Sequence, residues 1–170
     1  MRPLGYFGAC YENALIKDIA EQYNELQDMD ETDWSWLLGK IGAHYWMKWC
    51  EASPSTEAQE IRDRLKELPK NQLACLIQAI GNKGSATRPL GFYSCDYQIP
   101  LIEDVHDYFG DYLDNLNEVD QMWLLGMMGE YYFLNHQENQ ESDKATYVYS
   151  MLFQLDRYNC GALLHALSNR

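Results

Sequence analysis

The sequence predicts an all-α protein made of two tandem homologous helical subdomains, with about four helices in each. Two observations lead to this prediction. Apolar residues recur at helical spacing through most of the chain, and no long stretch alternates apolar and polar residues with the period of a strand. In addition, the tetrapeptide RPLG at residues 2–5 returns at 88–91, and WLLG at 36–39 returns at 123–126.

The repeated tetrapeptides indicate an internal duplication. Their offsets are 86 residues (from 2 to 88) and 87 residues (from 36 to 123), and the second offset continues to the C-terminal end, where Asn82 corresponds to Asn169. So long a period in only two copies is not that of a solenoid. We expect one copy over residues 1–83, a Gly- and Ser-containing linker over 84–87 and a second copy over 88–170, packed as a pseudo-two-fold bundle.

The first helix of each copy follows the Pro-Leu-Gly motif. Its apolar residues recur at helical spacing in both copies, so the two sequences support one another. The apolar positions are Leu15, Ile16, Ile19, Tyr23 and Leu26, and then Leu101, Ile102, Val105, Phe109 and Leu113.

The second helix of each copy begins after short acidic or amide side chains, which suit a helix N-terminus. Asp30 and Asp33 mark the start of one of these helices, which we expect to end near Cys50. Asn117 marks the start of the other, which we expect to end near His136.

Serines are the expected caps of the third helices. Ser55 and Ser142 precede segments that should end near Leu68 and Leu155, where Pro69 stops the first of them. Fourth helices are expected over residues 71–80 and 159–167.

Charge and composition exclude several classes of function. Lys and Arg number 13 against 26 Asp and Glu, which gives a net charge of −13, so attraction to nucleic-acid backbones and anionic membranes is disfavoured. The longest apolar stretch, residues 122–134, is short and interrupted by Glu130, and the N-terminal residues lack the apolar segment of a signal peptide. We expect no membrane-spanning helix and no leader.

The cysteines indicate a reducing compartment. The chain has five, an odd number, without a CxxC pair, and it is long enough to fold without disulfides. We therefore expect a cytoplasmic protein.

The clearest pattern that could carry a function is acidic. Four carboxylates at steps of three, four and three residues would share one face of the first helix in each copy. Like charges at this spacing repel by a few tenths of a kcal/mol per pair. The carboxylates are Asp18, Glu21, Glu25 and Asp28 in the first copy, and Asp104, Asp107, Asp111 and Asp114 in the second.

Two interpretations fit these stripes. They are either solvated faces that keep the protein soluble, or a surface that steers a basic partner. The stripe of the second copy is the stronger candidate for binding, because no Lys or Arg lies between Arg88 and Lys144 and because Tyr108 and Tyr112 interleave with its acids. In a sharper variant, the carboxylates stand in for phosphates and the protein is a nucleic-acid mimic that inhibits a nuclease or a defence complex.

A second doubled pattern predicts close helix packing. Because each glycine inside a helix costs about 1 kcal/mol relative to alanine, two in one helix indicate that another backbone approaches there. A ligand slot against the same ridge is the alternative. The residues of the pattern are Trp36, Gly39 and Gly42 in one copy and Trp123, Gly126 and Gly129 in the other.

No catalytic motif stands out. The four histidines are scattered without metal-binding spacing, and the chain has no P-loop, GxSxG or GxGxxG motif. An enzyme with a site between the copies, built on His44 or His136 and nearby acids, remains one alternative. Another is a structural subunit that assembles through exposed aromatic residues such as Tyr131 and Phe133.

The sequence as a whole favours a non-catalytic acidic binding module, that is, an adaptor, an antagonist or an immunity-type inhibitor. We expect it to dock on a basic protein partner through the carboxylates of the first helices, without direct contact with nucleic acid or membrane. No cofactor and no metal are expected.

Overall fold

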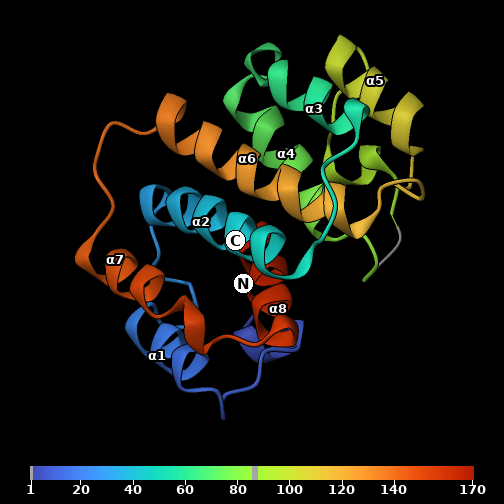
Figure 1. Ribbon diagram of the computed structural model, residues 1–170. Coiled ribbons are helices and arrows are strands. Elements are labelled where there is room, and N and C mark those ends of the chain that lie inside the picture. Colours follow the sequence, from blue (N-terminus) through green and yellow to red (C-terminus); the bar gives the residue numbers. More distant parts are fainter. Residues whose placement is uncertain (1, 86–87) are drawn as a thin grey trace.

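The computed structural model describes residues 2–85 and 88–170, and this part of the chain confirms the all-α prediction (Figure 1). It forms eight α-helices, four short 3₁₀ helices (η) and no strand. The elements are η1 (Leu4–Phe7), α1 (Ala14–Gln22), α2 (Glu31–Trp49), α3 (Thr56–Asp63), η2 (Leu65–Glu67), α4 (Lys70–Gly81), η3 (Leu90–Tyr93), α5 (Pro100–Phe109), α6 (Glu118–His136), α7 (Asp143–Ser150), η4 (Leu152–Gln154) and α8 (Arg157–Ser168).

Two further predictions concern the linker and membrane-spanning helices. Residues 86 and 87 of the expected linker lie outside the described residues. None of the described helices has the length and apolar character needed to cross a membrane.

The predicted helix caps are confirmed. Asp30 and Asn117 cap α2 and α6 by accepting hydrogen bonds from the backbone N–H groups three residues on. Ser55 and Ser142 do the same for α3 and α7. Each side chain satisfies an N–H group that the helix itself leaves unpaired, which is why these short polar residues fix the helix starts.

The long helices α2 and α6 run antiparallel through the centre of the molecule, where their backbones touch (Figure 1). A Cβ atom added to Gly42 would lie 2.6 Å from the backbone nitrogen of Gly126, and one added to Gly129 would lie 2.5 Å from the nitrogen of Gly39. Neither distance leaves room for a side chain. The four glycines of the doubled pattern therefore all lie at one helix crossing.

The remaining helices pack in two groups, one on each side of the central pair. The contacts join α1 to α7, η1 to α8, α3 to α5 and η3 to α4. Figure 1 shows α1, α7 and α8 on one side of the central pair, and α3, α4 and α5 on the other. One side thus joins segments from the two ends of the chain, whereas the other is built from consecutive elements within residues 56–109.

The first helices are shorter than the sequence predicts. α1 ends at Gln22, because Asn24, Glu25 and Leu26 adopt positive φ angles of 49°, 57° and 70°, which a right-handed helix cannot accommodate. α5 ends at Phe109, just before Gly110 with a φ of 88°. The apolar residues beyond these ends are still buried, but they belong to turns.

Candidate acidic binding surface

The four carboxylates of the second acidic stripe do not lie on one helix face, so that part of the prediction is wrong. Asp104 and Asp107 belong to α5, but Asp111 and Asp114 follow the turn at Gly110. Asp111 also has a structural role, because its side chain accepts a hydrogen bond from the Tyr97 hydroxyl. The stripe becomes two short groups of acids on one side of the molecule.

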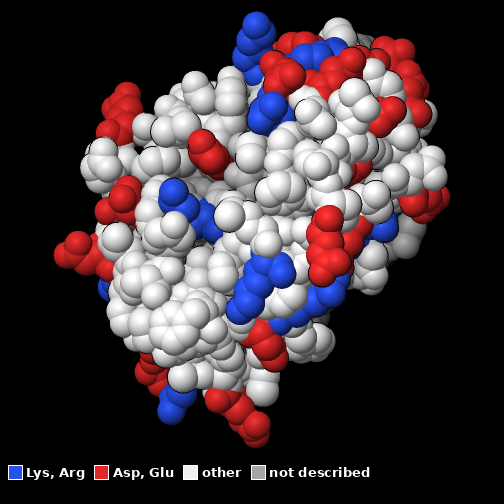
Figure 2. Space-filling view, viewed as in Figure 1, with Lys and Arg blue, Asp and Glu red and all other residues white. Residues whose placement is uncertain are grey.

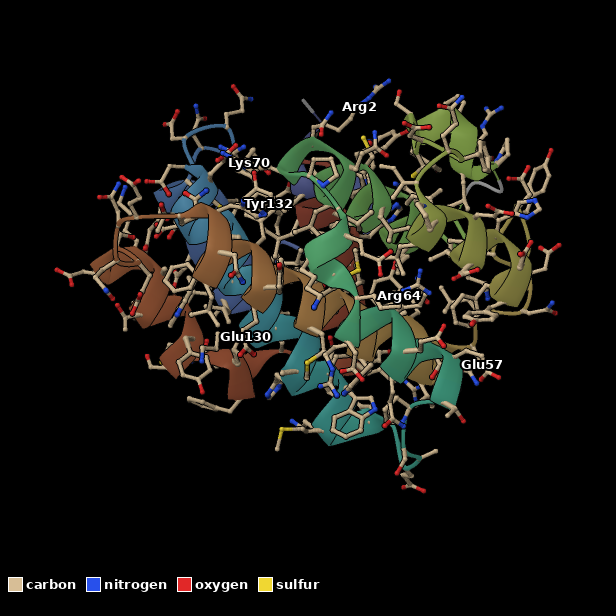
Figure 3. All side chains as sticks on the ribbon, turned by 90° about the horizontal axis from the view of Figure 1, so that it is seen from above. Arg2, Glu57, Arg64, Lys70, Glu130 and Tyr132 are labelled. Carbon is tan, nitrogen blue, oxygen red and sulfur yellow. The ribbon has the colours of Figure 1, made fainter. Side chains whose placement is uncertain are left out.

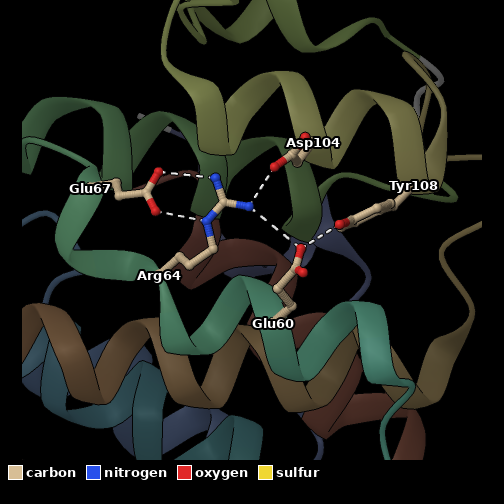
Figure 4. A network of polar contacts seen from close by, with 5 residues as sticks. All are labelled: Glu60, Arg64, Glu67, Asp104 and Tyr108. Atoms are coloured by element: carbon tan, nitrogen blue, oxygen red, sulfur yellow. Dashed lines mark hydrogen bonds and ion pairs between the residues drawn. The ribbon is translucent and has the colours of Figure 1, made fainter.

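Arg64 lies between α3 and η2 and forms an ion pair with Asp104 of the second stripe (Figure 4). Its guanidinium forms ion pairs with Asp104, with Glu67 (Nε to Oε2, 2.7 Å) and with Glu60 (Nη1 to Oε2, 3.4 Å). The Tyr108 hydroxyl donates a hydrogen bond to Glu60 from the α5 side. Arg64 thus connects carboxylates of α3 and η2 with a carboxylate of α5.

The hydrogen bonds of this cluster shift the pKa values of its members. Those from Arg64 lower the pKa of Glu67, while the partners Glu67 and Asp104 raise the pKa of Arg64. The hydrogen bond to Glu60 raises the pKa of Tyr108 to about 12. Each shift favours the protonation state that the group already has at neutral pH, with Arg64 charged, Glu67 ionised and Tyr108 protonated.

The carboxylates around this cluster outnumber the cations. From α3 through η2, and from α5 through the turn after it, nine carboxylates accompany three Lys or Arg residues and His106. We call this region the α3–α5 acidic surface, and Figure 2 shows its acidic side chains gathered over these helices at the upper right. Its acids are Glu57, Glu60, Asp63, Glu67, Glu103, Asp104, Asp107, Asp111 and Asp114, and its cations are Arg62, Arg64 and Lys66.

Much of the surface remains open to solvent. Glu57, Glu103, Asp107 and Asp114 are exposed, and Tyr112 is 45% exposed beside them. Figure 3 shows Glu57 and Arg64 on the same stretch of ribbon, with Glu57 nearer the edge of the molecule. Among the described residues, none of these four acids forms an ion pair with a lysine or arginine, and only Asp107 has a histidine beside it (His106 Nδ1, 3.4 Å), so their field reaches the solvent.

The acids of the first stripe are more dispersed. Asp18 and Glu21 lie on α1, whereas Glu25 and Asp28 lie beyond its end. Glu25 accepts hydrogen bonds from the backbone N–H of Leu4 (2.8 Å) and from a tyrosine hydroxyl, so it anchors the N-terminal segment. The prediction of one continuous helical face is therefore wrong here too, for the same reason as in the second stripe.

The two tryptophans of the doubled glycine pattern have different surroundings. Trp123 is buried, with the guanidinium of Arg62 5.2 Å from its ring centre. Trp36 is only partly buried and packs edge-to-face on Tyr149, with Lys40 over both rings.

The histidines named for the enzyme alternative lie among aromatic rings. His44 packs edge-to-face on Trp49, and His136 packs on Tyr131 and Tyr132. Burial lowers the pKa of His44. Within the described residues, no group of three or more His, Cys, Asp or Glu residues is arranged to hold a metal ion.

The sequence alone does not indicate that the acids of α3 and η2 belong to the site. Glu57, Glu60 and Glu67 share their segment with Arg62, Arg64 and Lys66, so that its charge looks balanced along the chain. The only sequence signal was the helical spacing between Glu60 and Arg64, which indicates a salt bridge within α3 but not the contact with α5.

Comparison with the models of known protein families, with curated proteins and with solved structures gives no match for this chain.

Proposed function

We propose that this protein is a non-catalytic binding module that docks on a basic protein surface through the α3–α5 acidic surface. The observation that carries the proposal is the density of negative charge there, nine carboxylates against three Lys or Arg residues on α3, α5 and the segments that follow them. Such a field attracts a basic partner and speeds the encounter. The Tyr112 ring supplies apolar contact area at its edge.

The Arg64 cluster explains how the surface tolerates so much charge. Arg64 offsets the repulsion where α3 meets α5, and leaves the outer acids such as Glu103 and Asp107 facing solvent. A basic partner would relieve the remaining repulsion by approaching those outer acids. Binding of this kind weakens with salt, because the screening length is only about 10 Å at 0.1 M ionic strength.

We also propose that the fold consists of two homologous copies, residues 1–83 and 88–170, related by a pseudo-two-fold axis between α2 and α6. Support comes from a pair of equivalent contacts, one from the first copy to the second and one from the second copy to the first. The Asp120 side chain accepts hydrogen bonds from the backbone and hydroxyl of Ser55, and Asp33 does the same for Ser142, 87 residues on.

A cytoplasmic location is proposed on the basis of the cysteines. All five are free thiols, and a protein in an oxidising compartment would be expected to use pairs of them.

The test is affinity capture from the source lysate with two variants of equal charge change. The surface variant neutralises four exposed acids of the α3–α5 acidic surface, and the control neutralises four exposed acids elsewhere. We expect wild type and control to retain a basic protein that about 0.5 M salt releases, and the surface variant to lose it. The surface variant is Glu57→Gln, Glu103→Gln, Asp107→Asn and Asp114→Asn, and the control is Glu12→Gln, Glu21→Gln, Glu51→Gln and Glu138→Gln.

Equal retention by all three proteins would refute the docking surface. If the retained protein binds nucleic acid, competition with duplex DNA then decides between simple docking and mimicry. A nucleic-acid mimic and DNA exclude one another on the target, whereas an adaptor on a separate basic surface leaves DNA bound.

A further inference from the structure

A hollow of about 530 Å³ lies where η1, α2 and α8 meet the end of α4. Its aromatic walls are Phe7, Tyr45 and Tyr158. A second hollow of about 440 Å³ adjoins it and shares Phe7, Ser85 and His165 with it. A volume of this order suits a small organic molecule, and a mostly apolar wall with a few polar groups is the usual make-up of such sites.

The charge of these two hollows is opposite to that of the protein. Arg157 and Lys83 line the first and Arg2 lines the second, and neither lining includes an Asp or Glu. Three further hollows of the molecule each include a glutamate, either Glu130 or Glu31. The chain has twice as many acids as bases, so a hollow lined by chance would be expected to include acids. A lining with cations and no acid is therefore unexpected.

The three cations differ in how they are held, and Arg2 lies over the Tyr6 ring, 4.7 Å from its centre. Arg157 is engaged with Glu118 and with the Tyr45 hydroxyl, which fixes it in the wall. Lys83 and Arg2 form no ion pair with any residue that the structure describes. Figure 3 shows Arg2 apart from Arg64 and Glu57, so the hollows are distinct from the α3–α5 acidic surface.

His165 adds a neutral polar group. Its Nε2 lies 2.8 Å from Oδ1 of Asn82, a side-chain carbonyl oxygen that can only accept, so Nε2 carries the hydrogen. Burial lowers the pKa of His165 and keeps the ring neutral at pH 7. Its Nδ1, 3.5 Å from the Ser85 hydroxyl, can therefore accept a hydrogen bond from that hydroxyl.

Small residues create the space. Gly161 and Ala162 of α8 face the first hollow, and a Cβ atom on Gly161 would meet only the Tyr45 ring, at 3.7 Å. The residues 87 positions earlier, Ala74 and Cys75, line a hollow of about 200 Å³ on the other side of the molecule, which also contains Glu31 and the Trp34 ring. The larger hollow is thus the one whose lining includes no carboxylate, and the nearby Glu118 is already paired with Arg157 and Tyr45.

We propose that the hollow between η1, α2 and α8 binds a small aromatic anion. The ligand's ring lies against the aromatic walls at Phe7 and Tyr45, and its anionic group faces Lys83, with Arg2 adding positive potential from the adjoining hollow. A phosphate or carboxylate suits this lining equally, because both accept hydrogen bonds from an ammonium group. The proposal does not depend on the docking function proposed above.

The test is calorimetric titration of the whole protein with 1-naphthyl phosphate at about 0.1 M salt. Inorganic phosphate, which lacks the ring, and 1-naphthol, which lacks the charge, are the comparison probes. We expect the naphthyl phosphate to bind at least about tenfold more tightly than either, because ring and charge contribute together.

Three variants locate the site. Gly161→Leu fills the hollow and should abolish binding, while Ala74→Leu, at the corresponding position of the opposite hollow, should leave the affinity unchanged. Lys83→Met should weaken binding about fivefold or more and leave the affinity for 1-naphthol unaltered. Melting curves show which variants are folded, and Lys83→Met carries the test if Gly161→Leu is not. Unchanged affinity in folded Gly161→Leu or in Lys83→Met, or equal affinity for 1-naphthol in the wild type, would overturn the proposal.

Discussion

The crossing of α2 and α6 predicts an unusual response to a small substitution. Replacing a helical glycine by alanine normally stabilises a helix by about 1 kcal/mol. At Gly129 the added Cβ atom would lie 2.5 Å from the backbone nitrogen of Gly39 and 3.0 Å from its Cα. Reaching an ordinary contact of 3.4 Å requires the helices to separate by about 0.9 Å, and backbone cannot turn aside as a flexible side chain can.

The magnitude follows from two opposing effects. Overpacking a rigid contact costs about 3 kcal/mol, and the gain in helix propensity returns about 1 kcal/mol, so Gly129→Ala should lower the free energy of unfolding by about 2 kcal/mol. For a chain of 170 residues this corresponds to a melting temperature lower by about 4–8 °C. Urea denaturation and thermal melting followed by circular dichroism measure both quantities.

The matched control is Gly161→Ala in α8, where the new Cβ atom has room, 3.7 Å from the nearest Tyr45 atom. Here only the propensity gain applies, and the melting temperature should rise by about 2–4 °C. The two substitutions are chemically identical but should have opposite signs. If Gly129→Ala melts at or above the wild-type temperature, the backbone contact between α2 and α6 is not as close as described.

Three further predictions concern buried groups. Asp33 accepts hydrogen bonds from the Ser142 backbone and hydroxyl, so Asp33→Asn should lower the free energy of unfolding by about 2 kcal/mol, and a loss below about 0.5 kcal/mol in urea denaturation would contradict this. Burial lowers the pKa of His165 below its ordinary value of 6.5, so the unfolded chain binds the proton first and stability falls as the pH drops through 6.5. The urea midpoint should therefore fall more in wild type than in His165→Gln between about pH 7.5 and about pH 5.5, and equal falls would exclude this origin. Burial raises the pKa of the Cys95 thiol to about 12, whereas Cys10 is exposed. A thiol reagent at about pH 8 should modify Cys10 in the native protein and Cys95 only on unfolding, as read by mass spectrometry of the peptides; rapid native labelling of Cys95 would show that it is accessible.

The helix starts could be predicted from the sequence because they depend on local chemistry. Asp30, Ser55, Asn117 and Ser142 each accept a hydrogen bond from an N–H group three residues away, which any reader of the sequence can anticipate. The ends of the first helices could not be predicted in this way. Leu26 is buried at a helical spacing from its neighbours although it lies in a left-handed turn, so the apolar pattern continues past the helix.

The acidic surface could be predicted only in part, because its central contact is not local. The spacing of Asp104 and Asp107 in the sequence predicts that they share one helix, and both lie on α5. The residue that organises them, Arg64, lies 40 residues earlier in the chain and reaches Asp104 only because α3 packs on α5. Sequence spacing reports neighbours on one helix, whereas such an ion pair depends on tertiary packing.

A second helix pair, on the opposite side of the molecule, contains no arginine. There α7 packs on α1, and the Tyr147 hydroxyl donates a hydrogen bond of 2.9 Å to Asp18. Tyr147 stands 87 residues after Glu60, and Met151 stands at the same offset from Arg64, so a helix pair of similar lengths (9 and 8 residues, against 10 and 8) forms there without an arginine, although Asp18 supplies a carboxylate. Two helices of this kind can therefore pack without an arginine between them. This difference agrees with the proposed docking on a basic surface, in which the exposed acids around Arg64 would face the partner.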